Sequence, residues 1–327
     1  MNSRVDDLRE ECIWLTCMFL IITMAASPLL VPSVSASESA QDTRDGWAAI
    51  MEINEYPEGW TDIPTDYNDT HRWMNTLTAL GWQESHILIV NEAFDLAKVV
   101  EAIQFLTNNT DENDIALMFI AAHGMWLNNT IAQNDTFVNK WEEIPSQNKL
   151  LCISSCLAGR FTELVAGDTN PEIAVSAVGP NEYSWAGLEE EGLPIIGCVW
   201  NYFFTNALLN ISADTDSNGD VTVEEAYGFA YPLTRAYYED YVYPYSHEIK
   251  VLNNFVAPHP GMDDNYEGEL SLRLESITSL TETTTTTETT TTTETTADFD
   301  QWLGPAAIIT SVMVAVVLIL VIIVKRR

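Results

Sequence analysis

The sequence is poor in basic residues. Its 327 residues include 14 lysines and arginines against 48 aspartates and glutamates, which gives a formal net charge of −34 at neutral pH. A protein that binds nucleic acid needs a basic surface to neutralise phosphates, and attraction to anionic lipid also needs positive charge. The charge therefore argues against both classes. The hydrophobic fraction of 46% argues against a chain that is disordered throughout.

Cysteine is also scarce. Two of the five cysteines, Cys12 and Cys17, lie in an apolar N-terminal segment, which leaves Cys152, Cys156 and Cys198. Cys152 and Cys156 lack a second pair of ligands, which argues against a zinc site. The odd number of remaining thiols raises the question whether one of them is reactive. Cys152 and Cys198 are expected in the core, and a disulfide between them is left open by spacing alone.

The N-terminus has the pattern of a secretory signal. Residues 13–26 are apolar, and the small residues Val34 and Ala36 offer a cleavage site. The first eleven residues carry more acidic than basic side chains, whereas a signal normally begins with positive charge. An uncleaved anchor and a misassigned start codon are the alternatives. We expect residues 1–36 to be a signal peptide that is removed.

An apolar segment near the C-terminus predicts a membrane span. Residues 303–324 are long enough to cross a hydrocarbon core of roughly 30 Å. The basic residues 325–327 follow directly and are expected in the cytoplasm. Residues 276–302 are rich in threonine and glutamate, which favours an extended stalk. These segments predict a single-pass type I protein of the cell membrane, and a buried core helix is the alternative for the span. Five sequons agree with an exported glycoprotein: Asn68, Asn108, Asn128, Asn134 and Asn210.

Residues 45–275 are predicted to form one domain in which apolar runs alternate with helical patterns. Such runs, separated by helices, predict an α/β fold with a mostly parallel sheet that is covered by helices on both faces. The expected strands are residues 47–53, 86–90, 115–121, 150–153 and 173–178. The expected helices are residues 66–80, 94–106, 135–144, 194–210 and 223–238, with Pro232 bending the last of them.

Two of the expected strands end in residues with catalytic potential. The strand at 115–121 leads to His123 and Gly124, and the strand at 150–153 leads to Cys156. The carboxyl ends of parallel strands share one edge of a sheet, so these residues can meet there. An imidazole near a thiol can act as general base and then protonate a leaving amine. The N–H groups of Gly124 and Cys156 can form an oxyanion hole, because glycine leaves its amide accessible. The alternative is a buried thiol and an unrelated core histidine.

Residues 214–225 match the twelve-residue calcium loop of an EF-hand. Side-chain oxygens occupy positions one, three and five, Gly219 makes the turn, and the last position is a glutamate. The alternative is an acidic surface turn. The pattern predicts a Ca²⁺ ion with a structural or regulatory role, and nothing indicates an organic cofactor. The predicted ligands are Asp214, Asp216, Asn218, the carbonyl oxygen of Asp220, and Glu225.

With these motifs, residues 47–272 resemble the caspase–legumain superfamily of cysteine peptidases, and in particular its prokaryotic caspase-like or legumain-like members. The resemblance rests on the strand that ends in His123-Gly124 and the strand that ends in residues 156–159. Residues 53–56, 68–69 and 180–184 add to it. It implies a caspase-like fold and hydrolysis of peptide bonds, with Cys156 as nucleophile and His123 as general acid and base.

The resemblance also implies a specificity pocket. In metacaspase-like members the position of Asp69 lines this pocket and favours arginine or lysine. A second acidic residue usually stands two positions before the nucleophile, and Ser154 stands there instead, which puts a basic preference in question. Legumain-like members cleave after asparagine or aspartate. Ser184 and Glu182 are candidates for the same pocket by position, and an ordinary loop is the alternative for Glu182.

The sequence as a whole predicts a membrane-anchored, extracytoplasmic cysteine endopeptidase that acts on proteins or peptides and is stabilised by calcium. Two other classes stay open. One is a transpeptidase or transamidase on the same fold, because the layout matches that of the glycosylphosphatidylinositol transamidase subunit. The other is a calcium-binding adhesion module without catalytic activity.

Overall fold

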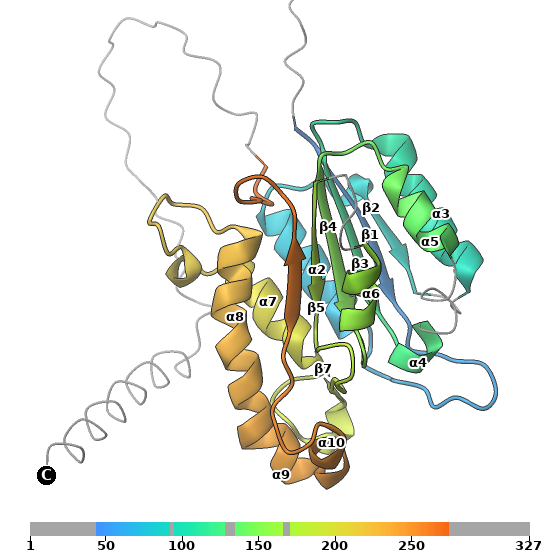
Figure 1. The fold of residues 1–327 in the computed structure, drawn as a ribbon, viewed down its shortest axis with the longest axis vertical. Helices are drawn as coiled ribbons and strands as arrows, with labels where there is room; N and C mark the ends of the chain where they lie inside the picture. Colours follow the sequence, from blue (N-terminus) through green and yellow to red (C-terminus); the bar gives the residue numbers. More distant parts are fainter. Residues whose placement is uncertain (1–43, 92–94, 128–134, 166–170, 275–327) are drawn as a thin grey trace, which may run out of the picture. The chain divides into compact units, whose positions relative to one another are not determined.

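The structure, a computed structural model, describes residues 44–91, 95–127, 135–165 and 171–274 (Figure 1). The predicted signal, stalk, membrane span and cytoplasmic tail lie outside these residues, as do the sequons at Asn128 and Asn134. Within the described ranges, no helix combines the length and the apolar character that crossing a bilayer requires.

Six strands form one sheet in the order β2-β1-β3-β4-β5-β8 (Figure 1). The first five strands are parallel, and β8 pairs antiparallel with β5 at the edge. Every residue of β3 is buried, which explains its continuous apolar run. The predicted mostly parallel sheet is confirmed, whereas β8 was not foreseen. The strands are β1 Gly46–Glu52, β2 Ile87–Val90, β3 Ile115–Ala121, β4 Asn148–Ser154, β5 Glu172–Ser176 and β8 Gly261–Asp264.

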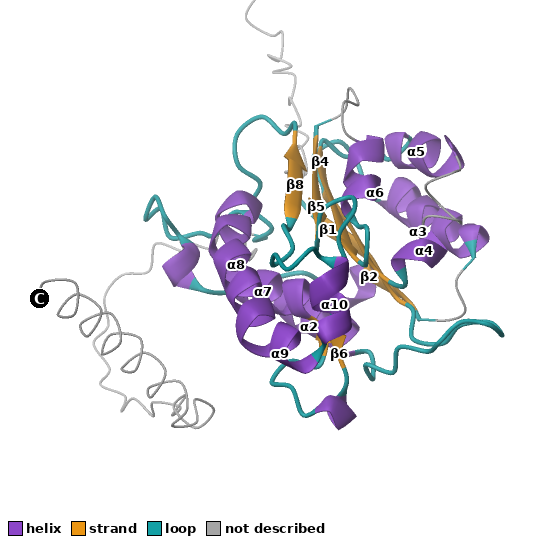
Figure 2. Cartoon of the chain, turned by 60° about the horizontal axis from the view of Figure 1, so that its bottom comes forward, coloured by secondary structure: helices purple, strands orange, loops and turns teal. Residues whose placement is uncertain are grey.

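Helices cover both faces of this sheet, as predicted (Figure 2). One side carries α2 (Asn68–Ala79), α7 (Val199–Leu208) and α8 (Val223–Tyr237). The other side carries α3 (Leu96–Asn109), α5 (Asp135–Glu142) and α6 (Gly159–Val165). The short helices and turns are η1 Glu84–His86, α4 Gly124–Leu127, η3 Glu189–Glu191, η4 Ile211–Ala213, the π-helical turn η5 Tyr238–Val242, α9 Tyr243–Tyr245 and α10 His247–Leu252.

Aromatic side chains join the sheet to the helices. Trp73 of α2 is fully buried, with its ring centroid 5.6 Å from Phe119 of β3 and 6.2 Å from Phe204 of α7. Such contacts add to the stabilisation that the buried apolar area provides. The helix α3 begins where the Asp95 side chain accepts a hydrogen bond from the Lys98 N–H at 2.9 Å, which caps its first turn.

Three predicted helices begin later than expected. The helix predicted from residue 94 begins at Leu96, after the Asp95 cap, and each of the other two also has a local reason. The helix predicted from residue 66 begins at Asn68, because Asp66 and Tyr67 have φ angles of 51° and 54°. The helix predicted from residue 194 begins at Val199, because residues 197–198 form β7 (Gly197–Cys198), which pairs with β6 (Ala186–Gly187). The last of these differences bears on function, because β7 forms part of the wall of the candidate site.

The described sequons differ in environment. The Asn68 side-chain amide donates a hydrogen bond to the Thr65 carbonyl, whereas the Asn108 side chain is exposed. The Asn210 side chain accepts a hydrogen bond from the Ser212 N–H at 3.0 Å. Glycosylation itself stays a prediction.

Candidate active site

A cavity of about 380 Å³ contains both predicted catalytic side chains. His123 follows β3 and Cys156 follows β4, and the last residues of these paired strands, Ala121 and Ser154, are partners in the sheet. Parallel pairing therefore brings the two strand-end loops together, as the sequence predicted. The catalytic roles of the two side chains stay predictions.

The chain turns sharply just after Cys156. Leu157 has a φ angle of 61°, a left-handed conformation that costs a non-glycine residue roughly 1–2 kcal/mol. Its N–H donates to the Glu182 carbonyl at 2.8 Å, and the Gly159 N–H donates to the Val178 carbonyl at 3.0 Å. These bonds hold the strained turn against the segment that follows β5. The thiol is thereby displayed at the end of β4.

Gly124 lies in direct contact with the nucleophile loop. A Cβ atom on Gly124 would come within 1.8 Å of the Cys156 carbonyl oxygen and 3.0 Å of the Cys156 Cα. The two backbones therefore approach so closely that only glycine fits at position 124. The sequence did not show this requirement. Gly124 also begins α4, and the first N–H groups of a helix have no partner within it. This arrangement is compatible with the predicted oxyanion role.

The loop after β1 holds His123. The backbone N–H of His123 donates to the Tyr56 hydroxyl at 2.8 Å, and the two ring centroids lie 4.6 Å apart. The Nε2 atom of His123 lies 2.7 Å from the Thr61 carbonyl oxygen. A carbonyl oxygen only accepts hydrogen bonds, so Nε2 carries the proton, and Nδ1 of the neutral ring has the free lone pair. The sequence motif at residues 53–56 pointed to this loop but not to its contacts with histidine.

The Cys156 thiol contacts Ser184. Its Sγ atom lies 3.7 Å from the Ser184 carbonyl oxygen, to which it donates, and 3.7 Å from the Ser184 hydroxyl, from which it accepts. Burial raises the pKa of the Cys156 thiol, and hydrogen bonding by Ser184 acts in the opposite direction. The thiol is thus protonated at neutral pH in this state, so a base such as His123 must remove its proton before attack.

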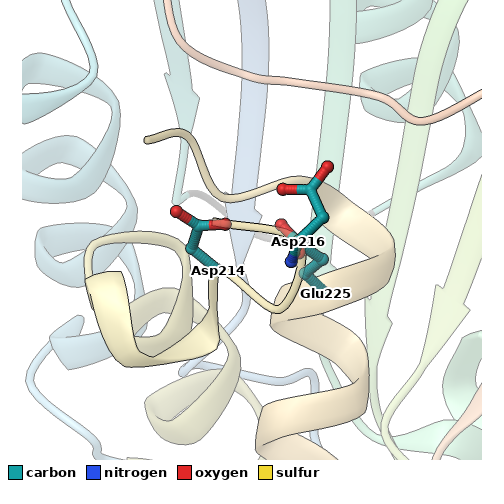
Figure 3. A group of neighbouring side chains, drawn as sticks. All are labelled: Asp214, Asp216 and Glu225. Carbon is teal, nitrogen blue, oxygen red and sulfur yellow. The ribbon is translucent and has the colours of Figure 1, made fainter. Parts of the chain in front are cut away.

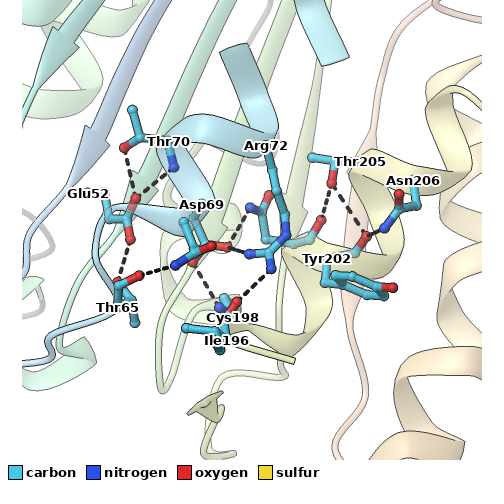
Figure 4. A network of polar contacts seen from close by, with 12 residues as sticks. Glu52, Thr65, Asp69, Thr70, Arg72, Ile196, Cys198, Tyr202, Thr205 and Asn206 are labelled. Atoms are coloured by element: carbon cyan, nitrogen blue, oxygen red, sulfur yellow. Dashed lines mark hydrogen bonds and ion pairs between the residues drawn. The ribbon is translucent and has the colours of Figure 1, made fainter. Parts of the chain in front are cut away.

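Asp69 lines the same cavity, where the resemblance placed it, but its charge is countered inside the protein (Figure 4). Its carboxylate accepts hydrogen bonds from Arg72 Nη1 at 3.0 Å, from Asn201 Nδ2 at 2.8 Å and from the Cys198 N–H at 2.8 Å. Burial raises the pKa of Asp69, the nearby Glu52 carboxylate adds to this, and Arg72 opposes it. The Asp69 carboxylate therefore already has a cationic partner and two further hydrogen-bond donors within the protein, without a basic substrate.

Glu52 is a second buried carboxylate in the cavity wall, and the sequence reasoning missed it. It accepts from the Thr65 hydroxyl at 2.6 Å, and from the Thr70 N–H at 2.6 Å and the Thr70 hydroxyl at 2.8 Å (Figure 4). All of these donors are uncharged. A charged residue at the carboxyl end of a buried strand was the signal that could have revealed it.

The predicted calcium loop brings carboxylates together. Single oxygens of Asp214, Asp216 and Glu225 all lie within 4.8 Å of one another, and Figure 3 shows the three side chains converging. Ligand oxygens at 2.3–2.6 Å from a calcium ion lie up to about 5 Å apart, so this donor set fits the ion. Asp220 points its carboxylate to Arg273, 3.0 Å away, and to the Ser271 hydroxyl. That agrees with the expectation that Asp220 offers only its carbonyl.

The last ligand of the loop also begins a helix. Thr222 and Glu225 form a capping box at the start of α8, in which Glu225 Oε2 accepts the Thr222 N–H at 3.2 Å. The Asn218 side chain accepts the Asp220 N–H at 2.8 Å. The loop thus has the turn and the helix start of its motif, and the bound ion stays a prediction.

The three described cysteines are all free, so the disulfide that spacing left open does not form. Cys152 and Cys198 are buried, as expected. Cys198 also lines the cavity, and burial raises its pKa to about 12, which makes its thiol unreactive at neutral pH.

No family model matches the sequence, and no curated protein matches it either. Among solved structures, the chain is similar to a caspase-1 from Spodoptera frugiperda. The two are 12% identical, with a TM-score of 0.47, over 71% of this chain and 91% of that chain. A likeness at this level concerns the fold alone and carries neither activity nor substrate to this chain.

Proposed function

We propose that this chain is a cysteine endopeptidase that hydrolyses peptide bonds with Cys156 and His123. The observation that carries the proposal is that His123 and Cys156 line one cavity, while a strained turn follows the thiol and Gly124 packs against the Cys156 backbone. A thiol and an imidazole with a free lone pair that line one cavity, and a glycine that packs against the backbone of the nucleophile, are the components of acyl transfer.

In the proposed reaction, His123 Nδ1 takes the thiol proton as Sγ attacks the scissile carbonyl carbon. The N–H groups of Gly124 and Cys156 stabilise the resulting oxyanion. The imidazolium then gives its proton to the leaving amine, which leaves a thioester on Cys156. Water, deprotonated by His123, cleaves the thioester and restores the thiol. The Thr61 carbonyl, which accepts the hydrogen bond from Nε2–H, stabilises the imidazolium that forms between these steps.

We further propose that the residue before the scissile bond is basic. The described residues that line the cavity include the carboxylates of Glu52, Asp62, Asp69 and Glu191 but no lysine or arginine. Arg72 counters Asp69 from behind the wall, so the remaining negative charge comes from the other three residues. Replacement of Arg72 by glutamine should therefore increase the preference for arginine and lysine over asparagine.

The proposal includes a location and an ion. The apolar segment at residues 303–324 and the basic residues after it support an anchor with the catalytic domain outside the cell. The carboxylates of Asp214, Asp216 and Glu225 support a calcium ion that ties the loop to α8. Such a site would be filled outside cells even with a Kd of order 10⁻⁴–10⁻³ M.

The test uses the full-length chain, purified in detergent with calcium, beside Cys156→Ala. Both proteins are incubated with a mixed peptide library, and every product is identified by mass. We expect wild-type cleavage, mainly after arginine or lysine, and no cleavage by the variant. Products that carry an added amine in place of a free acid would instead identify transfer chemistry. If folded, calcium-loaded protein cleaves nothing, even after limited proteolysis, the peptidase proposal fails.

A further inference from the structure

The Ser184 side chain lies against the sulfur atom of Cys156. Its hydroxyl donates to Sγ at a distance of 3.7 Å, within the range of hydrogen bonds to sulfur. We infer that Ser184 is a catalytic residue whose hydroxyl stabilises the Cys156 thiolate, in addition to any contact with the substrate. This inference rests on the proposed role of Cys156 as nucleophile.

Hydrogen bonds of the two residues that precede Ser184 hold its backbone in position. The Glu182 carboxylate accepts the Gly179 N–H at 2.9 Å and the His259 N–H at 2.7 Å. Next in the chain, the Tyr183 N–H donates to Asn253 Oδ1 at 2.7 Å, and Asn253 Nδ2 donates to the Tyr183 carbonyl at 2.9 Å. A hydroxyl on so constrained a backbone is preorganised toward the sulfur, so little reorganisation is needed when charge develops there.

The backbone around the thiol is tied to the same segment. The Leu157 N–H donates to the Glu182 carbonyl at 2.8 Å, so the residue after the nucleophile and the residue two before Ser184 are linked. This bond links the two loops, so Sγ and the Ser184 hydroxyl keep their positions relative to each other. Ser184 is therefore held close to Cys156 by the backbone as well as by its own side chain.

The two contacts of Ser184 with the thiol respond oppositely to ionisation. In the resting thiol, S–H donates to the Ser184 carbonyl at 3.7 Å. When His123 takes the proton, that bond is lost and the carbonyl oxygen repels the sulfur anion. The hydroxyl bond then becomes charge-assisted and stronger. The hydroxyl thus offsets the burial that disfavours the thiolate, until the carbon–sulfur bond to the substrate forms.

The test measures thiolate formation without relying on peptidase activity. Full-length wild-type, Ser184→Ala and Ser184→Thr proteins are alkylated with iodoacetamide across a pH series, and modification of the Cys156 peptide is followed by mass. Loss of one hydrogen bond should reduce the alkylation rate of Ser184→Ala at pH 7 about 3- to 10-fold and move its pH midpoint upward. Ser184→Thr keeps the hydroxyl and should stay close to wild type.

The matched control is Ser154→Ala, which removes another hydroxyl from the same cavity. That hydroxyl forms a hydrogen bond with the Cys198 thiol, so the pH dependence of Cys156 alkylation should not change. An unchanged profile in Ser184→Ala overturns the inference, as does a Ser184→Thr variant that behaves like Ser184→Ala. On a cleaved peptide, kcat of Ser184→Ala should fall while KM stays, whereas a role in the substrate pocket alone would raise KM. If wild type cleaves no peptide, the proposed function fails while the alkylation result still decides this inference.

Discussion

Replacement of Gly124 by alanine tests the contact on which the candidate site depends. The added Cβ would lie 1.8 Å from the Cys156 carbonyl oxygen, whereas real Cβ atoms essentially never come closer than 3.0 Å to another atom. The two loops must therefore separate by about 1.2 Å or more. Both partners in this contact are backbone, so no flexible side chain can absorb the change.

Separation of the two loops should lower both the stability and the activity of the protein. Overpacking of this size costs about 1–3 kcal/mol of folding free energy. For a domain of this length, that lowers the melting temperature by roughly 2–12 °C. Displacement of reacting groups by about 1 Å can cost on the order of 100-fold in rate, so kcat/KM should fall at least that much. Thermal unfolding and hydrolysis of the best library peptide measure the two effects.

Gly228→Ala is the matched control, because a Cβ atom at Gly228 meets nothing within 4 Å. Gly228 lies inside α8, where alanine is favoured over glycine by roughly 0.5–1 kcal/mol. We therefore expect this variant to be slightly more stable and fully active. Wild-type stability and activity in Gly124→Ala would show that the two loops do not approach as closely as the structure has them, and would refute the reasoning.

Three further predictions concern the same site and the calcium loop. Tyr56→Phe keeps the aromatic ring beside His123 but removes the hydroxyl that accepts the His123 N–H. We expect kcat to fall about 3- to 10-fold with KM constant, and an unchanged kcat would exclude this positioning role. Chelation of roughly 10 mM calcium should lower the melting temperature by about 3–10 °C. Glu225→Gln, which can still complete the capping box, should abolish that difference, and identical wild-type curves with and without chelator would argue against the site. Because burial raises the pKa of Cys156, the pH midpoint of its alkylation should lie above the value of about 8.5 for a free thiol, and a lower midpoint would contradict the burial argument.

Much of the sheet was predictable because its strands are buried on both faces. Such strands read as continuous apolar runs, and the run at 115–121 became β3 with the same limits. The meeting of the two proposed catalytic residues was predictable for a related reason. A histidine and a cysteine that each follow such a run must lie at one edge of a parallel sheet, and His123 and Cys156 do line one cavity.

The antiparallel edge strand β8 and the pairing of β6 with β7 were not predictable from periodicity. β8 comprises only residues 261–264, which include a glycine and two aspartates, and it is placed by its partner β5. The β6–β7 pair has two residues in each strand. Segments this short carry no detectable period, so their structure depends on neighbours that are distant in the chain.

The acidic residues in the cavity wall show the same limit in chemical terms. The family resemblance implied that Asp69 is a pocket residue, but the sequence could not show that Arg72 counters its charge, because one turn of a helix allows that contact without requiring it. Nor could it show that Glu52 joins the same wall.

The sequence by itself determined which chemical groups this protein carries and in what order: a thiol and an imidazole at two strand ends, side-chain oxygens at EF-hand spacing, and an excess of acidic residues. These follow from residue type and local order, which a one-dimensional pattern preserves. Only the tertiary structure decided that Ser184 reaches the sulfur, that Tyr56 and Thr61 hold the histidine, and that Gly124 must have no side chain. The physical reason is that each of these contacts joins segments separated by 28 or more residues. Such pairs meet only after the parallel sheet has formed.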